Sequence, residues 1–389
     1  MFGVYLSHSK TLVGDNYQLN KALFCINEPF YMKSEKESIQ REILGLKRKR
    51  KLKRNFYEEK LNEKQKLIIS KIINQVKLND NTLSGDNEDA KRAANVHINQ
   101  AIDIQTNTSF CNDNDHLLLI DGYLIPPKCS FMCSDVIHGL QLMHKYYSEG
   151  RFQIDKDFLI IIDPPWLNKS VKRKKCYFIQ NHQDILKTTQ ELSLFINCLP
   201  IDVLVKIAIW TTECEKSFVI DEMIPMLNST VTHVMLWHKI TKTGQSVKLR
   251  GGCEYLIIAS LIVKSLTVKS LNYQKLSSDD ECMMKNGVLV SIPSAIHSHK
   301  PPITFEFIQK IQSLNPNQSE IIIMMENEGQ VNTNNKQFAQ TEIGLIKDRI
   351  NNRINGLELY ARYLRHSFHS IGFECIQLQH ELFYESNNN

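Results

Sequence analysis

FLIIIDPPWLNKSVKRKK, residues Phe158 to Lys175, gives the strongest indication of the fold in this sequence. Five apolar residues in succession end at Asp163, a pattern typical of a parallel strand that is buried on both faces. Pro164 restricts Asp163 to an extended conformation, and the second proline fixes the turn that follows. Open α/β sheets bind ligands at the carboxyl ends of their strands, so this pattern predicts a carboxylate delivered to a binding site.

Similar apolar runs occur on both sides of this stretch. We expect strands within residues 117–120, 158–162, 203–209, 231–237, 255–263, 288–292 and 357–360. Apolar residues at helical spacing predict helices around residues 136–147, 184–197 and 303–314. Strands that alternate with helices indicate an α/β fold, in which helices cover both faces of a mostly parallel sheet.

Composition changes divide the chain into three predicted regions. Residues 1–34 form a small N-terminal region, residues 35–115 a basic helical segment with a polar linker from residue 79, and residues 116–389 the main domain. Asn, Gln and Glu are in excess at about 315–356, which predicts a polar insertion in that domain. Within it, the apolar run at 321–325 is a candidate for a buried or partner-binding piece.

The run KRKRKLKR, Lys47 to Arg54, has seven basic residues out of eight. Like charges at helical spacing repel one another and destabilise an isolated helix, so we expect an acidic partner there rather than only solvent. A nuclear import receptor and a phosphate backbone both fit, and we favour the import receptor. The sequence therefore predicts a nuclear protein that is also found in the cytoplasm.

The composition argues against several other classes of protein. The chain has 389 residues and a formal net charge of +5, too mild to identify a nucleic-acid binder by itself. Its apolar runs fall far short of the ~20 residues that span a bilayer. The ten cysteines are scattered without paired Cys or His spacing. Free thiols are therefore expected, and neither a zinc site nor any other metal.

The groups that follow the predicted strand suit a nucleic-acid base. The Asp163 carboxylate and the Pro164 carbonyl are hydrogen-bond acceptors, as an exocyclic amine with two N–H groups requires. Trp166 offers a ring on which an extruded base could stack, and five basic residues follow within 169–175, where they could hold phosphates. The alternative is a carboxylate that caps a turn beside a packed tryptophan.

Asp163-Pro164-Pro165-Trp166 resembles the DPPW motif of the eukaryotic adenine-N6 methyltransferases. The continuation 168–173 is similar to one branch of that family, methyltransferase-like protein four. Further matching segments follow in order at 237–239, 253–256, 297–302 and 357–362. The resemblance covers roughly residues 117–312 and 356–378, and it implies a Rossmann-like sheet that binds S-adenosylmethionine and transfers a methyl group to adenine N6 without a metal.

The resemblance also implies roles for individual residues. The catalytic residues would be Asp163, Pro164, Pro165 and Trp166. Substrate would bind to Asn168, Lys169, Lys172, Arg173, Trp237 and Lys239. The cofactor would bind to Asp135, Val136, Asp163, Lys300, Arg362, Gly372 and Glu374. An N-terminal helix cap at Asp135, a solvated loop lysine at Lys300 and structural roles for His297 and His299 are the alternatives.

Two departures from the family pattern leave a second interpretation open. Phe373 stands where the family has Asn, and the turn at 363–368 lacks the usual Pro and Trp, so both raise the question of cofactor affinity. The branch implies an adenosine, already 2′-O-methylated, in small nuclear RNA, and DNA adenine is the alternative substrate. A non-catalytic subunit that binds nucleic acid or a partner protein is the alternative function.

Overall fold

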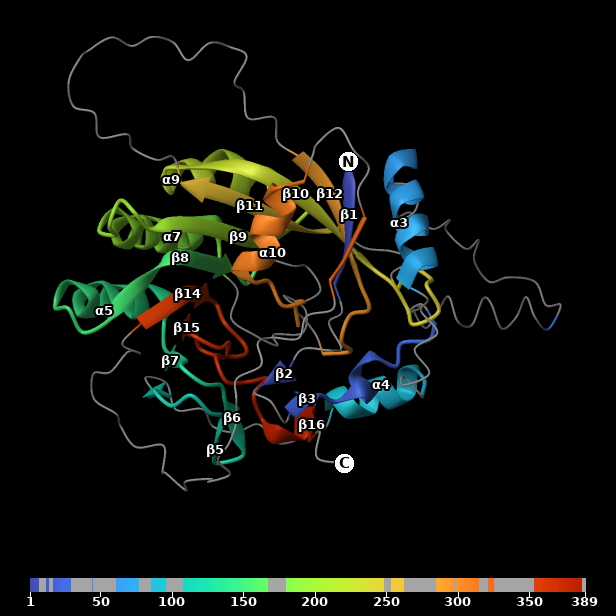
Figure 1. Cartoon of the computed structure of the whole chain (residues 1–389), viewed down its shortest axis with the longest axis horizontal. Helices are drawn as coiled ribbons and strands as arrows, with labels where there is room; N and C mark the ends of the chain where they lie inside the picture. Colours follow the sequence, from blue (N-terminus) through green and yellow to red (C-terminus); the bar gives the residue numbers. More distant parts are fainter. Residues whose placement is uncertain are drawn as a thin grey trace, which may run out of the picture.

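An eleven-stranded sheet forms the centre of the molecule (Figure 1). The computed structural model describes residues 1–6, 12–13, 17–28, 44, 61–76, 85–95, 108–166, 180–247, 253–261, 285–296, 299–314, 321–324 and 353–386. The strands of the sheet are β1 (Phe2–Leu6), β4 (Thr108–Cys111), β7 (Ser130–Cys133), β8 (Gln153–Ile162), β9 (Leu204–Thr212), β10 (Ser229–Lys239), β11 (Glu254–Leu261), β12 (Lys285–Ser291), β13 (Ile321–Met324), β14 (Arg353–Leu359) and β15 (Phe368–Ile371). Their order is β13-β1-β12-β10-β11-β9-β8-β14-β15-β7-β4, and only β11 and β4 run antiparallel to their neighbours.

Helices cover both faces of this sheet, as the alternation of strands and helices predicts. Phe158, Ile160 and Ile162 pack in one core cluster with residues of α5 (Val136–Ser148) and α7 (His182–Asn197). The alternate residues Leu159 and Ile161 belong to a second cluster, with α10 (Phe305–Gln312). The apolar run before Asp163 is therefore buried on both faces, and the Rossmann-like α/β fold is confirmed.

Smaller elements surround the main sheet. They are a sheet of β16 (Tyr384–Ser386), β3 (Tyr17–Leu19) and β2 (Leu12–Val13), a hairpin of β5 (Leu118–Ile120) and β6 (Tyr123–Ile125), and the short helices η2 (Lys21–Phe24), α8 (Lys216–Phe218), η4 (Val219–Met223), α9 (Ile224–Met226) and η5 (Glu381–Phe383). Across the ranges described above, no helix is long and apolar enough to cross a membrane. The eight cysteines in those ranges are free thiols.

β14 and β15 lie inside the main sheet, between β8 and β7. β14 pairs with β8 on one side and with β15 on the other, and β15 pairs in turn with β7. All of these pairs are parallel, so four carboxyl ends meet at one edge of the sheet. The last part of the chain is thereby placed beside the turn after β8, where the sequence predicts a binding site.

Segments assigned to extensions also enter the main fold, which corrects part of the predicted organisation. β1 pairs in parallel with β12 and with β13, so the predicted insertion supplies a strand, and β14 already begins at Arg353. The segment 79–115 is not simply a linker, because it contains α4 (Asn87–Asn95) and β4. In the basic segment, α3 (Glu63–Val76) buries Ile68, Ile69 and Ile72, whereas residues 47–54 lie outside the described part.

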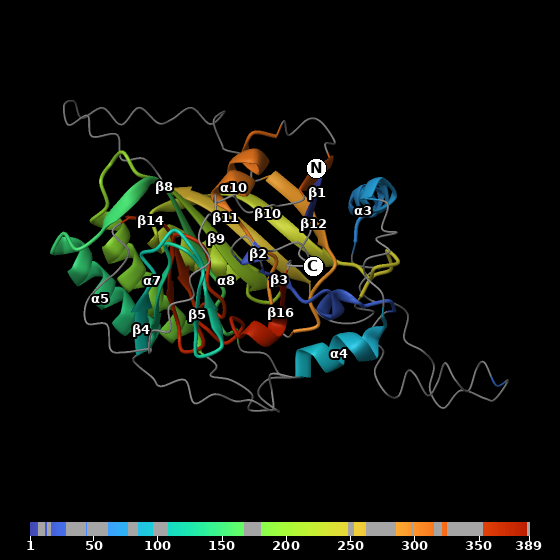
Figure 2. The ribbon, with the colours of Figure 1, turned by 60° about the horizontal axis from the view of Figure 1, so that its bottom comes forward.

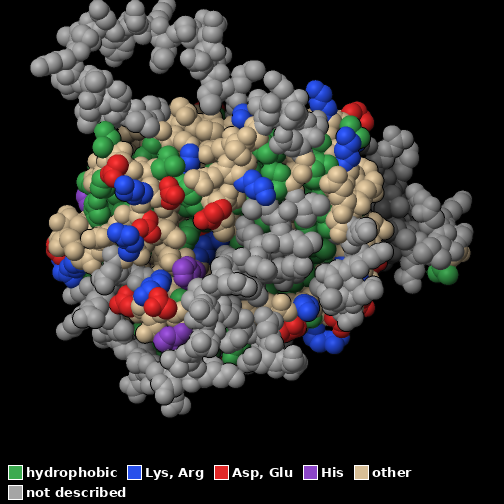
Figure 3. Space-filling view, in the orientation of Figure 1, with side chains coloured by type: hydrophobic (Ala, Val, Ile, Leu, Met, Phe, Trp, Pro, Cys, Tyr) green, Lys and Arg blue, Asp and Glu red, His purple; other side chains and the backbone are tan. Residues whose placement is uncertain are grey.

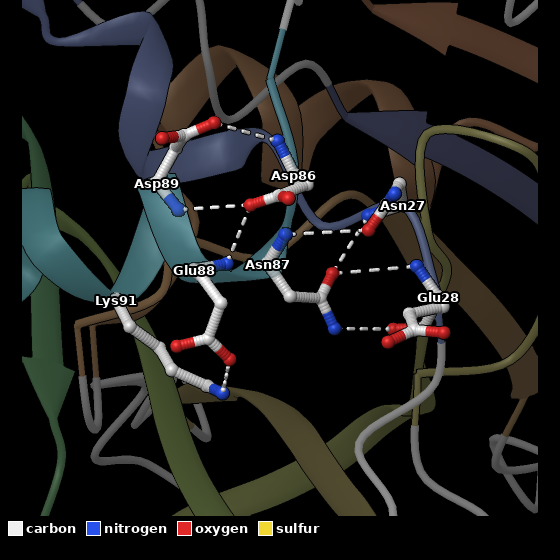
Figure 4. A network of polar contacts seen from close by, with 7 residues as sticks. All are labelled: Asn27, Glu28, Asp86, Asn87, Glu88, Asp89 and Lys91. Atoms are coloured by element: carbon white, nitrogen blue, oxygen red, sulfur yellow. Dashed lines mark hydrogen bonds and ion pairs between the residues drawn. The ribbon is translucent and has the colours of Figure 1, made fainter.

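The amino end of α4 is fixed by a network of hydrogen bonds, seen from close by in Figure 4. Asp86 caps the helix, since its Oδ1 accepts from the backbone N–H groups of Glu88 and Asp89. The Asn87 side chain accepts from the backbone N–H groups of Asn27 and Glu28 and donates to the Glu28 carbonyl. Figures 1 and 2 both place α4 near the small sheet, away from α5 and α7.

Candidate functional site

A half-open pocket lies at the carboxyl ends of β7, β8, β14 and β15. It encloses about 480 Å³, part of which is open to solvent. The lining residues are Val136, Pro165, Gln180, Tyr360, Ala361, Arg362, Gly372, Phe373 and Glu374. The structure thus brings together five residues of the predicted catalytic and cofactor sites, from segments more than 200 residues apart in the sequence.

Gly372 lets two walls of the pocket lie in direct contact. A Cβ atom at this position would meet the backbone of Tyr360 and Ala361 at 3.1–3.2 Å, a tight contact that a small shift of that backbone would have to relieve. Tyr360 is in the left-handed region with φ 60°, and its hydroxyl oxygen lies 2.7 Å from Gln180 Oε1 and 3.0 Å from Thr188 Oγ1, within hydrogen-bond distance of both. Burial raises the pKa of this hydroxyl well above its usual value. The turn after β14 is therefore held closely from both sides.

The polar groups at the pocket are an ion pair and the N-terminus of α5. Arg362 Nε lies 3.4 Å from Glu374 Oε2, and the two side chains are 15% and 35% exposed. Asp135 caps α5, because its Oδ1 accepts from the N–H groups of Ile137 and His138 at 3.0 and 3.2 Å. The cap interpretation of Asp135 is therefore the one that the contacts show, while Val136 lines the pocket itself.

Beside the pocket, four charged side chains of alternating sign follow one another. Asp163 Oδ1 lies 3.4 Å from Lys300 Nζ, and Lys300 Nζ lies 3.1 Å from Glu254 Oε2. The other oxygen of Glu254 lies 2.6 Å from Lys239 Nζ. None of the four side chains is more than 20% exposed. Three predicted site residues thus meet around Glu254, whose role the sequence did not reveal.

The electrostatics of this row centre on Lys300. Burial lowers the pKa of the Lys300 ammonium, but the carboxylates of Asp163 and Glu254 outweigh that effect and raise the pKa above its usual value. Lys300 is therefore charged at neutral pH and holds the Asp163 carboxylate at the end of β8. The alternative of a solvated loop lysine does not fit, because its side chain is only 13% exposed.

Trp166 is buried, which corrects the expectation that its ring is free to stack on a base. Its side chain is 9% exposed, and its indole N–H donates to the Trp210 carbonyl at 2.9 Å. The Pro164 carbonyl also differs from the expectation, because it accepts from the Trp166 backbone N–H at 2.8 Å. A carbonyl oxygen has two lone pairs, so one remains for a ligand. Trp166 therefore braces the turn that presents Asp163.

Trp237 and His299 are also buried side chains, and their contacts are typical of structural residues. Trp237 is 2% exposed and donates its indole N–H to Ser291 Oγ, which corrects the expectation that its ring is open to substrate. The Lys239 ammonium lies 3.8 Å from the centre of that ring. Trp237 therefore contacts the charged row through a cation–π interaction with Lys239. Burial, with Arg365 nearby, lowers the pKa of His299 to about 3, and this side chain is therefore neutral at physiological pH.

Several predicted residues lie outside the described part of the chain. They are Asn168, Lys169, Lys172 and Arg173, together with His297 and the basic run 47–54. Figure 3 shows blue and red side chains interspersed over the described part of one face. The predicted phosphate contacts of 169–175 remain predictions.

Comparisons with known proteins identify the domain. Residues 158–323 match the MT-A70 family, and the match begins on β8 and includes the whole charged row. The central part of the chain, residues 158–323, is therefore similar to the MT-A70 family. This agrees with the DPPW resemblance, and MT-A70 proteins are S-adenosylmethionine-dependent methyltransferases.

Individual proteins that are similar to this chain carry the names of N6 methyltransferases. A mouse (Mus musculus) protein, "N(6)-adenine-specific methyltransferase METTL4", is 29% identical over 209 residues, which are 52% of this chain and 40% of the relative. The human METTL4 match, also 29% identical, covers 48% of this chain and 37% of the relative. The chain thus spans less than half the length of these two relatives. A Caenorhabditis elegans "DNA N6-methyl methyltransferase" is 25% identical over 94% of this chain and 92% of its own length.

The residues of this pocket fit S-adenosylmethionine, the cofactor that the MT-A70 match implies. Val136 and Pro165 supply apolar walls for a flat heterocycle, and Glu374 supplies a carboxylate that can accept from two ribose hydroxyls. Lys300 supplies a buried cation for the carboxylate of the methionine part. Phe373, 42% exposed on the same pocket, stands where the family has Asn, as the sequence indicates. In the described ranges, no cluster of His, Cys, Asp and Glu could hold a metal.

Proposed function

We propose that this protein methylates adenine N6 in nucleic acid and uses S-adenosylmethionine. The observation that carries the proposal is the Asp163–Pro165 turn at the end of β8. Pro165 lines the pocket that fits the cofactor, while Asp163 lies in the charged row with Lys300. The MT-A70 match over this segment and the names of the relatives support the same reaction.

The residues of the turn would act on the exocyclic amine of the base. Asp163 and the remaining lone pair of the Pro164 carbonyl would accept its two N–H groups and thereby orient the nitrogen. As positive charge develops on the nitrogen, the fixed carboxylate stabilises it. S-adenosylmethionine, when bound, supplies the methyl group as an electrophile on a positively charged sulfur. Lys300 balances the charge of the Asp163 carboxylate and keeps it in place.

Nucleoside mass spectrometry tests the reaction. Wild-type protein and an Asp163→Asn variant would be incubated with S-adenosylmethionine and either small nuclear RNA or DNA. Asn keeps the size but loses the charge and one acceptor, so we expect product to fall by at least about 100-fold, as for loss of one electrostatic group. Product that persists in Asp163→Asn would contradict the mechanism. No product from wild type, with nucleic acid still bound, would favour the non-catalytic subunit.

The polymer is the second part of the proposal. We infer an adenosine in small nuclear RNA, already 2′-O-methylated, from the resemblance to one branch of the family. DNA adenine is the second candidate, favoured by the nematode relative, which matches this chain over nearly its whole length. An extruded adenine presents the same edge in both polymers, and only the 2′ position distinguishes them. The same assay therefore decides, because its product is either a ribonucleoside or a deoxyribonucleoside.

We also propose nuclear import through the basic run Lys47–Arg54. Changing its seven basic residues to Gln should move a fluorescently tagged protein from the nucleus to the cytoplasm. Methylation of a short oligonucleotide in vitro should stay unchanged, which separates import from substrate binding. If the variant stays nuclear, the basic run is not the import signal. If methylation of the oligonucleotide falls instead, the basic run contacts substrate phosphates.

A further inference from the structure

A buried ion pair lies close to the loop that carries Lys300. Arg365 Nε is 2.6 Å from Glu358 Oε2, and both side chains are 6% exposed. Glu358 comes from β14, between Leu357 and Leu359, which pack in the cluster of α5 and α7. Its side chain therefore points to the opposite face of the sheet. Burying two charges costs free energy unless further hydrogen bonds satisfy them, so the remaining contacts of Arg365 matter.

The other nitrogens of Arg365 reach the segment that contains Lys300. Its Nη1 donates to the Ile303 carbonyl at 3.4 Å, and its Nη2 donates to the Tyr363 hydroxyl. The Tyr363 ring contacts the His299 ring edge-on, with 5.4 Å between the ring centres. One guanidinium is thus connected to both ends of 299–303, and Lys300 lies between these two attachment points.

We propose that Arg365 is a positioning residue that, anchored on Glu358, holds the 299–303 segment so that Lys300 faces Asp163. This inference rests on the proposed function, because it assigns Arg365 a task in the same site. Arg365 contacts Glu358, Ile303 and Tyr363, and in this proposal it acts through Lys300, which lies 3.4 Å from Asp163 Oδ1. It also explains the departure at 363–368, since an anchored arginine stabilises the turn that lacks the usual Pro and Trp.

The charge of Arg365 has a second effect in the same place. Burial raises the pKa of Glu358, the Arg365 guanidinium opposes this, and the Asp163 charge raises the pKa further. The two carboxylates therefore repel each other. With Arg365 bound to Glu358, Lys300 is left to Asp163 and Glu254. Without the guanidinium, Glu358 is an uncompensated buried carboxylate that competes for nearby cations.

Two ligands of different length test this positioning. S-adenosylhomocysteine contains the amino-acid part that Lys300 would bind, whereas 5′-methylthioadenosine lacks it. Calorimetry would measure both Kd values for wild type, for Arg365→Lys and for the double variant Glu358→Leu/Arg365→Leu. The double variant removes both charges together and avoids an unpaired buried carboxylate. Arg365→Lys keeps the charge but loses the planar guanidinium that contacts Glu358, Ile303 and Tyr363 together. Lys300→Met shows the pattern expected for a lost ammonium.

We expect the double variant to bind S-adenosylhomocysteine about tenfold more weakly, since a small misplacement of a binding group has effects of this size or larger. Its Kd for 5′-methylthioadenosine should stay within about twofold, and Arg365→Lys should show the same pattern more weakly. Equal weakening for both ligands would overturn the proposal, because a general structural role predicts it. Unchanged binding of both ligands would overturn it as well. If wild type binds neither ligand, the proposed function falls, and this inference with it.

Discussion

At the scale of single residues, Gly372 is a position of the pocket that has little space for a side chain. The atoms that a Cβ would meet belong to the backbone of Tyr360 and Ala361, so no side-chain rotation relieves the contact. Gly372→Ala should separate the two walls and lengthen the 3.4 Å contact between Arg362 and Glu374. We expect a loss of about 1–3 kcal/mol of stability, as for overpacking, and weaker S-adenosylhomocysteine binding.

Thermal unfolding and calorimetry would measure both effects of Gly372→Ala. Gly150→Ala is the matched control, because it also replaces a glycine, but no atom lies within 4 Å of its Cβ position. Gly150 has φ +68°, so its variant should lose stability without weaker ligand binding. Equal ligand affinity in Gly372→Ala and wild type would show that the pocket does not need this close approach.

At the same scale, the sequence motif predicted some features of the site and not others. The apolar run and the two prolines predicted a carboxylate at the end of a strand, because these constraints are local. The orientation of Trp166 was not predictable, since it depends on the Trp210 carbonyl 44 residues away. Arg365 was noted only as part of an atypical turn, because a charged residue in sequence gives no sign that its partner Glu358 is buried.

At the scale of elements, the start of α5 couples helix stability to the pocket. Asp135 caps this helix, and Val136, the next residue, lines the pocket. Asp135→Ala should lower the free energy of unfolding by about 1 kcal/mol, the usual cost of a lost N-cap. Asp135→Asn should restore most of that stability, since an amide oxygen caps equally well.

Ligand binding by the Asp135 variants separates its two interpretations. If Asp135 only caps the helix, Asp135→Asn should bind S-adenosylhomocysteine with wild-type affinity in calorimetry. A substantially weaker Kd in this variant, with its stability retained, would instead show that the carboxylate contacts the cofactor. If Asp135→Ala unfolds at the same temperature as wild type, the predicted loss of stability from the missing helix cap is contradicted.

Strands that carry a continuous apolar run were predictable at this scale, including the three-residue β5, and β15 was not. β8, β9, β10 and β11 each carry a long apolar run, and all four runs were recognised. β15 has only four residues, two of them His and Ser, and its burial comes from its neighbours. The local sequence pattern therefore identified the strands with long apolar runs. β15 and β1 depend instead on pairing with strands that are distant in the sequence.

At the scale of the whole molecule, buried histidines should make stability depend on pH. Burial lowers the pKa of His233, His238 and His369 to about 4 and that of His299 to about 3. In the unfolded chain, these side chains take up protons below about pH 6.5, whereas the folded protein keeps them neutral until about pH 4. The stability they contribute is therefore fully present above pH 6.5 and is lost as the pH falls towards 4.

Urea unfolding at pH 7.5, 6.0 and 5.0 would measure this loss, which amounts to about 3 kcal/mol at pH 4 for one such group. His233→Leu tests a single contribution, because His233 is 2% exposed and neither ring nitrogen has a hydrogen-bond partner among the described residues. This variant should lose less stability between pH 7.5 and 5.0 than wild type. The same loss in both proteins would mean that His233 accepts a proton in the folded state.

The insertion of β14 and β15 between β8 and β7 has a consequence for biosynthesis. The pocket needs Val136 and Glu374 together, and a ribosome adding about 5–20 residues per second takes roughly 10 to 50 s to make the chain between them. During that interval, the facing edges of β7 and β8 have no strand between them. The nascent chain must therefore be kept from aggregation until its last segments emerge, and a product that stops before residue 353 would lack both strands.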